Sequence, residues 1–137
     1  MVLLMLAALV RASTAGTPPD VWICDNQIEV WCVADGCDVR DQDETTPLSV
    51  TADRAGALSV CAYSGCWDAS AAVAASAGRI LWTAEDAPFS SPSSGASGTD
   101  LTVLIVEKEG VGFVRAGGLA TPLLCQRRAP SLDSTRR

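Results

Sequence analysis

The sequence of 137 residues contains no histidine. Histidine is the commonest general base and the commonest metal ligand in proteins, so its absence argues against much of enzyme chemistry. Basic residues are also scarce, with 10 Lys and Arg against 16 Asp and Glu and a net charge of −6. A protein that binds nucleic acid needs a basic face. We therefore predict no cofactor, no bound metal ion and no nucleic-acid partner.

Aromatic residues are few, and four of them are tryptophans: Trp22, Trp31, Trp67 and Trp82. Tryptophans can form a platform for a sugar or another ligand. Beside cysteines they more often pack against a disulfide, because they bring a large area to a small core. We expect the core role and keep the ligand platform as the alternative.

No apolar run is long enough to cross a membrane as a helix, which needs about 20 residues. The run that opens the chain, MVLLMLAALV, has the length of the apolar part of a secretory signal, and the small residues Ser13, Ala15 and Gly16 follow it. We predict a signal peptide over residues 1–15, with a buried first strand or helix as the alternative. The mature chain would then be periplasmic or secreted, without a membrane span. The use of Arg over Lys, with much Ala, Gly and Val, suggests a bacterial genome rich in G and C.

All six cysteines follow this segment. An even number of cysteines in an exported domain predicts a disulfide framework. Two stretches share one spacing, CVADGC from Cys32 to Cys37 and CAYSGC from Cys61 to Cys66. A glycine before the second cysteine lets the chain turn back, and facing residues of an antiparallel pair lie close enough for a disulfide. We predict two hairpin staples, with a four-thiolate zinc site as the alternative.

Cys24 and Cys125 remain, and they flank nearly the whole mature domain. A bridge between them would close a loop of about 100 residues and stabilise the fold by some 4 kcal/mol in the loop-entropy account. Such a bridge would tie the first strand to the last.

The rest of the chain reads as short strands separated by turn signals every eight to twelve residues. This rhythm predicts an all-β fold, a single antiparallel β-barrel or sandwich of about 8 strands. Residues 69–75 are ambiguous, and we favour a strand over a short helix. Pro122 confines the last strand to an edge or a bulge. The predicted strands are Val21–Cys24, Ile28–Ala34, Leu48–Asp53, Ala57–Tyr63, Ala69–Ala75, Arg79–Glu85, Leu101–Glu109, Val111–Gly117 and Leu119–Cys125.

Residues 86–100, DAPFSSPSSGASGTD, form the longest low-complexity stretch, and its Ser, Gly and Pro content disfavours regular structure. Long loops inside a compact domain are often functional. The β-domain would span residues 16–125, followed by a disordered tail over residues 126–137. The candidate residues of an interaction loop are Phe89, Ser90, Ser91, Ser93, Ser94 and Ser97.

Carboxylates crowd the segment around the first staple, but the spacing lacks the signature of a calcium loop, so we expect a solvated acidic loop. Nucleophilic catalysis would need a base beside a serine, and only Lys108 is at hand. We therefore predict that the protein is not an enzyme. The carboxylates are Asp35, Asp38, Asp41, Asp43 and Glu44.

With W-x-C at its start and a lone cysteine in its last strand, the chain resembles small secreted bacterial β-domain proteins. More distantly it resembles the bacterial membrane-bound and periplasmic inhibitors of c-type lysozyme. That resemblance covers the architecture from about Val21 to Cys125 and implies an eight-stranded antiparallel barrel with a disulfide near the chain ends. The inhibitors carry loop motifs with Ser, Gly, Tyr and Lys, of which SSGASG, residues 93–98, supplies the small residues only.

Taken together, the sequence predicts a secreted or periplasmic, disulfide-stapled β-domain with a binding role, whose partner is an extracytoplasmic protein. The alternatives are an envelope-associated structural domain without a discrete site, and a lysozyme-inhibitor-like protein.

Overall fold

The computed structural model describes residues 20–90 and 98–129. The described part of the chain contains no helix that is long and apolar enough to cross a membrane. The predicted signal peptide, residues 1–15, lies outside the described residues, as do Ser91, Ser93, Ser94 and Ser97. A 3-10 turn spans Gln42–Glu44. The strands are β1 (Val21–Asn26), β2 (Val30–Val33), β3 (Gly36–Val39), β4 (Ser49–Asp53), β5 (Ala57–Ala62), β6 (Gly65–Ser70), β7 (Ala72–Ser76), β8 (Arg79–Ala87), β9 (Phe89–Ser90), β10 (Thr99–Val106), β11 (Val111–Ala116) and β12 (Leu119–Arg128).

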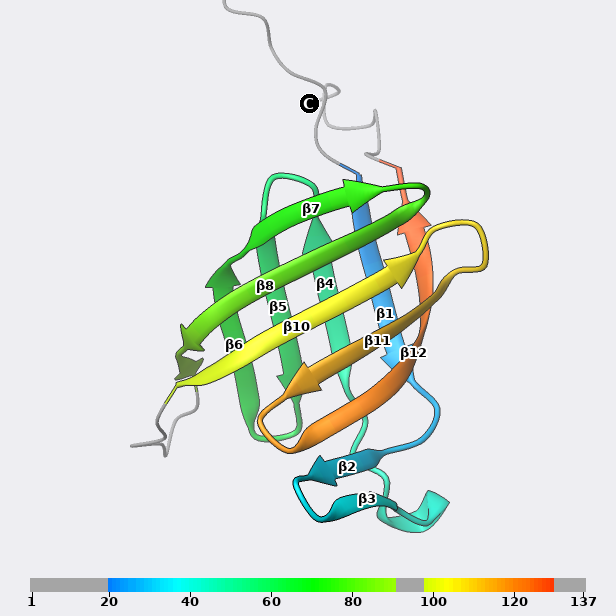
Figure 1. The fold of residues 1–137 in the computed structure, drawn as a ribbon, viewed down its shortest axis with the longest axis vertical. Helices are drawn as coiled ribbons and strands as arrows, with labels where there is room; N and C mark the ends of the chain where they lie inside the picture. Colours follow the sequence, from blue (N-terminus) through cyan, green and yellow to red (C-terminus); the bar gives the residue numbers. More distant parts are fainter. Residues whose placement is uncertain (1–19, 91–97, 130–137) are drawn as a thin grey trace, which may run out of the picture.

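All strands belong to one antiparallel sheet in the order β7-β8-β10-β11-β12-β1-β4-β5-β6-β9, with β2 attached to β12 and β3 to β2. The sheet curls, so that β7, β8 and β10 cross in front of β1, β4 and β5 (Figure 1). The predicted all-β class is confirmed. The predicted antiparallel, barrel-like arrangement is also confirmed, but the number of about 8 strands is wrong, because the sheet is a curled half-barrel of 12 strands that does not close.

The extra strands arise partly where the chain changes partner. Ala71 separates β6, which pairs with β5, from β7, which pairs with β8. Its N–H donates to the carbonyl of Gly56 at 2.7 Å, which fixes the crossing point. Pro88 likewise separates β8, the partner of β10, from β9, the partner of β6. The interpretation of residues 69–75 as strand rather than helix is therefore confirmed, with a break at Ala71.

Alternate residues of the strands point into the curl and form the core, as the two-residue period of a strand requires. Trp82 is fully buried, and its Nε1 donates to the carbonyl of Asp53 at 2.7 Å. Trp22 is also buried, but its Nε1 has no hydrogen-bond partner among the described residues. The buried apolar residues are Trp22, Cys24, Leu48, Val50, Ala52, Leu58, Val60, Ile80, Trp82, Ala87, Leu101, Val103, Ile105, Val114, Ala116, Leu119, Leu123 and Cys125.

The last strand, β12, is central in the sheet, with β11 on one side and β1 on the other. The expectation that Pro122 places it at an edge or a bulge is wrong for a local reason. On that side β1 reaches only to Leu123, and β2 bridges β12 only at Leu119. The missing N–H of the proline therefore falls in a gap where no ladder partner stands. β12 also continues to Arg128, so residues 126–128 belong to the sheet and not to the predicted tail.

The six cysteines form the pairs that their spacing predicts. Cys24–Cys125 joins facing positions of β1 and β12, across a sequence separation of 101. Cys32–Cys37 staples β2 to β3, and Cys61–Cys66 staples β5 to β6. No cysteine is free in the described ranges. β3 is the return strand of the first predicted hairpin; it was not among the predicted strands, and the structure shows it exposed throughout.

Candidate binding cleft

A cleft of about 250 Å³ opens at the end of the half-barrel where the β2–β3 hairpin, the β5–β6 turn and the β11–β12 turn lie (Figure 1). Its walls are mostly apolar with a few polar groups, which is the usual composition of a ligand site. Larger hollows, of about 310 to 590 Å³, are lined mainly by residues on the outer faces of strands. The cleft is lined by Glu29, Trp31, Thr46, Leu48, Ala62, Trp67, Thr99, Ala116, Gly117, Gly118 and Leu119.

Trp31 forms one wall of the cleft from β2. This strand is tied to β12 by few bonds: the N–H of Val30 donates to the buried hydroxyl of Thr121 at 2.7 Å, and the N–H of Cys32 donates to the carbonyl of Gly118 at 2.8 Å. The indole lies against Gly118, where a Cβ would come within 2.9 Å of the ring atom Cε3. Glycine at this position therefore permits the close approach. Trp31 remains 40% exposed, so the wall faces solvent.

Glu29 places a carboxylate in the cleft, although the residue is only 4% exposed. Its Oε1 accepts a hydrogen bond from Nε1 of Trp31, and its Oε2 accepts one from the N–H of Thr46 at 2.6 Å. Burial raises the pKa of Glu29, but these hydrogen bonds and, least of all, the charge of Arg40 lower it, and the resulting pKa lies below the ordinary value of 4.5. Glu29 is therefore negatively charged at neutral pH.

Asn26 holds the two segments that carry these groups. Its Nδ2 donates to the carbonyl of Thr46 at 3.0 Å and lies 3.2 Å from the carbonyl of Ile28. Its Oδ1 accepts from the N–H of Leu48 at 2.8 Å. One amide side chain thus fixes the distance between the start of the β2 segment and the approach to β4.

Trp67 forms another wall, from β6. Its ring packs against Phe89, with ring centroids 4.8 Å apart and planes tilted by 49°. The chain of β9 passes so close to the β5–β6 hairpin that a Cβ on Gly65 would lie 2.1 Å from the carbonyl oxygen of Ser90. Gly65 also has a φ of +152°, which favours glycine. The β9 residues therefore act as a backing for Trp67.

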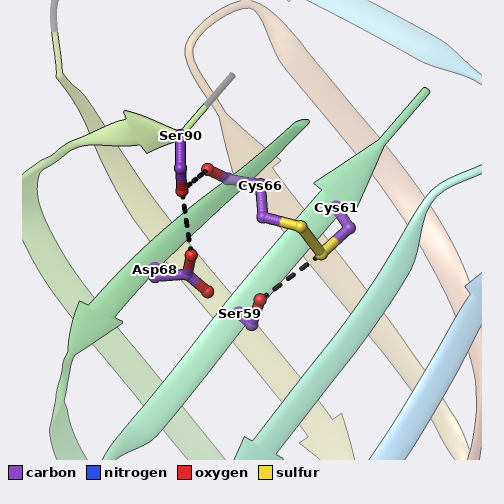
Figure 2. The surroundings of a disulfide bond; sticks show 5 residues. All are labelled: Ser59, Cys61, Cys66, Asp68 and Ser90. Atoms are coloured by element: carbon purple, nitrogen blue, oxygen red, sulfur yellow. Dashed lines mark hydrogen bonds between the residues drawn. A yellow bond between two sulfur atoms is a disulfide. The ribbon is translucent and has the colours of Figure 1, made fainter. Parts of the chain in front are cut away.

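Two residues of the predicted interaction loop, Phe89 and Ser90, lie in the described part of the chain and form β9, which pairs with β6. The hydroxyl of Ser90 lies 3.1 Å from the carbonyl of Cys66 and 3.1 Å from Oδ2 of Asp68, and it can donate its proton to only one of them at a time (Figure 2). On the neighbouring strand, the hydroxyl of Ser59 lies 3.4 Å from Sγ of Cys61. Ser90 and Phe89 thus hold β9 to β6, beside the second staple.

The acidic residues of the predicted solvated loop are all exposed; Asp35 and Asp38 lie on the β2–β3 hairpin and the other three follow it, at the cleft end of the molecule (Figure 1). Within residues 20–90 and 98–129, no group of three or more Cys, Asp or Glu side chains is placed to hold a metal ion. Arg40 lies among them and pairs with Glu44 at 3.8 Å.

The expectation of a core role holds for Trp22 and Trp82, but it is wrong for Trp31, which is exposed on one side, and incomplete for Trp67, which is half-buried. Glu29 was not among the candidate residues predicted from the sequence. Its signal was the alternation of the predicted strand from Ile28, which puts Glu29 and Trp31 on the same face. A charged and an aromatic side chain sharing one face of an exposed hairpin indicate a polar site better than a core.

A row of apolar side chains also crosses the outer face of the sheet. Leu81, Leu104, Phe113 and Pro122 stand opposite one another on β8, β10, β11 and β12. Phe113 is 39% exposed. We call this set the outer row, and it is distinct from the cleft, whose residues face the inside of the curl or belong to β2.

Comparison of the chain with protein-family models, with curated proteins and with solved structures finds no match to any of them. The functional argument therefore depends on the geometry of the cleft.

Proposed function

We propose that the protein is an exported binding domain that receives its ligand in the cleft, and that it is not an enzyme. The observation that carries this proposal is the cleft itself, where two tryptophans and a buried, charged glutamate converge on a largely apolar space. Among the lining residues that the structure describes, Glu29 is the only one that titrates. A carboxylate held by N–H donors, with a pKa below its ordinary value, stays ionised at neutral pH and is a weak base, so it suits recognition better than proton transfer.

Export is supported by the three disulfides, which form and persist in oxidising compartments. The test is expression of the full chain with its own leader, followed by intact-mass measurement without reductant. We expect a mass that begins near Gly16 and is six hydrogens lighter than the fully reduced chain. An uncleaved chain with reactive thiols in the cytoplasm would contradict export.

Binding is tested by nuclear magnetic resonance (NMR) on the oxidised, 15N-labelled protein, with a set of small cationic, neutral and anionic compounds. We expect saturable shifts of the indole N–H signals of Trp31 and Trp67, while the signals of Trp22 and Trp82 stay in place. Shifts that gather on the outer row instead would move the site away from the cleft. Absence of any saturable shift would favour a structural domain without a discrete site.

A further inference from the structure

We propose that the cleft recognises an organic cation, such as the end of a lysine or arginine side chain or a small alkylammonium ion. This inference rests on the proposed binding function and names its ligand class. It begins from a charge imbalance. Glu29 is negatively charged and 4% exposed, yet no lysine or arginine of the described residues forms an ion pair with it. A buried charge is costly unless it is paired, so a cation entering the cleft would supply the missing partner.

The carboxylate has room for another donor. A carboxylate offers about four lone-pair sites. Glu29 accepts from Trp31 on one oxygen and from the N–H of Thr46 on the other, and the side chain of Thr46 is a third hydrogen-bonding partner, which leaves about one site for another donor. These donors belong to the fold, so they orient the carboxylate before any ligand arrives. The charge of Arg40 contributes least to the lowered pKa of Glu29, and Arg40 pairs with Glu44 at 3.8 Å. The charge of Glu29 is therefore stabilised by hydrogen bonds but is not neutralised.

The walls suit the body of a cation as well as its charge. Trp31 and Trp67 both line the cleft. The face of an indole attracts a cation within about 6 Å of the ring, and tryptophan does so best among the aromatic side chains. An aromatic wall beside a carboxylate thus favours a cation with an alkyl body over an anion, which both features repel, and over a neutral alcohol, which gains from neither charge.

Size limits the ligand to one such group. The cleft holds about 250 Å³, which is below the 300 to 1,000 Å³ or so of sites for drug-sized molecules. An alkylammonium or alkylguanidinium group fits this scale, as a free compound or as a side chain of a partner polypeptide.

Long-range electrostatics point in the same direction. Between Ile28 and Leu48 the chain carries six carboxylates and one arginine, and the protein as a whole has a net charge of −6. Most of these carboxylates lie on the β2–β3 hairpin and the segment after it, at the cleft end (Figure 1). A surface of one sign concentrates ligands of the opposite sign near the site and speeds their association.

The test uses four compounds that share an unbranched butyl chain and differ in the head group: n-butylammonium, n-butylguanidinium, 1-pentanol and pentanoate, titrated by NMR into the oxidised protein at neutral pH. We expect the two cations to shift the indole signals of Trp31 and Trp67 and to bind at least tenfold more tightly than pentanol. We expect no binding of pentanoate. Raising the salt from about 50 to 500 mM should weaken the cations and leave pentanol unchanged. The cation proposal would be wrong if pentanol or pentanoate bound in the cleft with an affinity equal to or above that of the cations. The proposed binding function would still hold in that case. Absence of binding by all four would count against both.

Two variants locate the effect. Glu29→Gln keeps one acceptor oxygen and removes the charge, so cation affinity should fall about tenfold, to the level of pentanol. Glu109→Gln makes the same change on an exposed residue of the β10–β11 turn, at the other end of the half-barrel (Figure 1). This variant should bind the cations with the affinity of the parent protein. Unchanged cation affinity in Glu29→Gln would refute the proposal. Equal losses of cation and pentanol binding would show that Glu29 only shapes the wall.

A final pair of probes separates the two sources of the cation. Blocked Gly-Lys-Gly and Gly-Arg-Gly peptides present the same groups on a backbone. Peptide affinities equal to or above those of the butyl compounds would indicate a partner polypeptide. Binding of the butyl compounds alone would indicate a free amine.

Discussion

Removal of Cys24–Cys125 should destabilise the protein far more than removal of either hairpin staple. The two residues face each other on β1 and β12, with a sequence separation of 101, whereas each staple spans a separation of 5. In the loop-entropy account, a disulfide stabilises the fold by lowering the entropy of the unfolded chain. This stabilisation is about 4.7 kcal/mol for a loop of about 100 residues and only about 2 kcal/mol for a loop of about six. A domain of this kind is stable by about 5–15 kcal/mol in total, so the first loss is a large fraction and the second is modest.

The assay is urea unfolding of oxidised variants in which both cysteines of one bridge are replaced by alanine. Because Cys24 is fully buried and Cys125 nearly so, the substitution also leaves a cavity. A Cys24→Val, Cys125→Ala version refills part of that volume and isolates the effect of the loop. The reasoning fails if the refilled variant loses no more stability than a variant without one of the hairpin staples.

The two staples have equal loop lengths, yet they should differ in where their loss appears. β5 and β6 lie inside the continuous ladder, between β4 and β9. The β2–β3 hairpin joins the sheet at one residue pair, Trp31 with Leu119. Loss of Cys61–Cys66 should therefore lower the global free energy of unfolding, and loss of Cys32–Cys37 should mainly speed hydrogen exchange of β2 and β3. Equal global losses would contradict this division.

Three further outcomes follow from single side chains. The pKa of Glu29 is lowered in the folded state, so its stabilising effect is complete above the ordinary value of 4.5 and is lost as the pH falls through the folded pKa; between pH 7 and 3 the unfolding free energy of Glu29→Gln should fall less steeply than that of the parent. Trp82→Phe should cost about 1 kcal/mol more than Trp22→Phe in urea unfolding, because only Trp82 loses a hydrogen bond, the one that its Nε1 donates to the carbonyl of Asp53, while that carbonyl keeps the N–H of Gly56 as a second donor; equal losses would show that packing alone decides. Gly118→Ala should displace the indole of Trp31 and shift its N–H signal, since the new Cβ would lie 2.9 Å from the ring; an unmoved signal would mean that the backbone yields instead.

Period-two alternation and cysteine spacing were enough to predict the strand class and the three bridges. Leu101, Val103 and Ile105 alternate with less buried residues along β10, and each is at most 1% exposed. Each hairpin staple needs only a local turn, which the repeated glycine made visible, and Cys24 and Cys125 were then the two cysteines left to pair. Strand alternation and short cysteine spacings are local features of the sequence, so they can be predicted without knowledge of the tertiary structure.

The number of strands and the openness of the sheet were not predictable in this way. At Ala71 the chain leaves one partner strand for another, but an alanine between two alternating segments gives no sign of a break. Pro122 gave the opposite error. A proline normally excludes a strand from the centre of a sheet, yet here the ends of β1 and β2 leave a gap opposite it, and that gap depends on the three-dimensional arrangement of three strands.

The cleft was missed because one of its walls belongs to the β2–β3 hairpin, which pairs with the rest of the sheet at one residue pair. Glu29 and Trp31 belong to a segment that joins β12 by one residue pair and a few hydrogen bonds, and Thr46 meets them from another part of the chain. The first staple keeps this hairpin rigid within itself, while the long bridge stabilises the sheet that supports it. Opening of this hairpin away from β12 should therefore cost less free energy than opening of the continuous sheet. A ligand that joins the carboxylate of Glu29 to the opposite wall would bind both parts, so ligand binding should slow hydrogen exchange most strongly in β2 and β3.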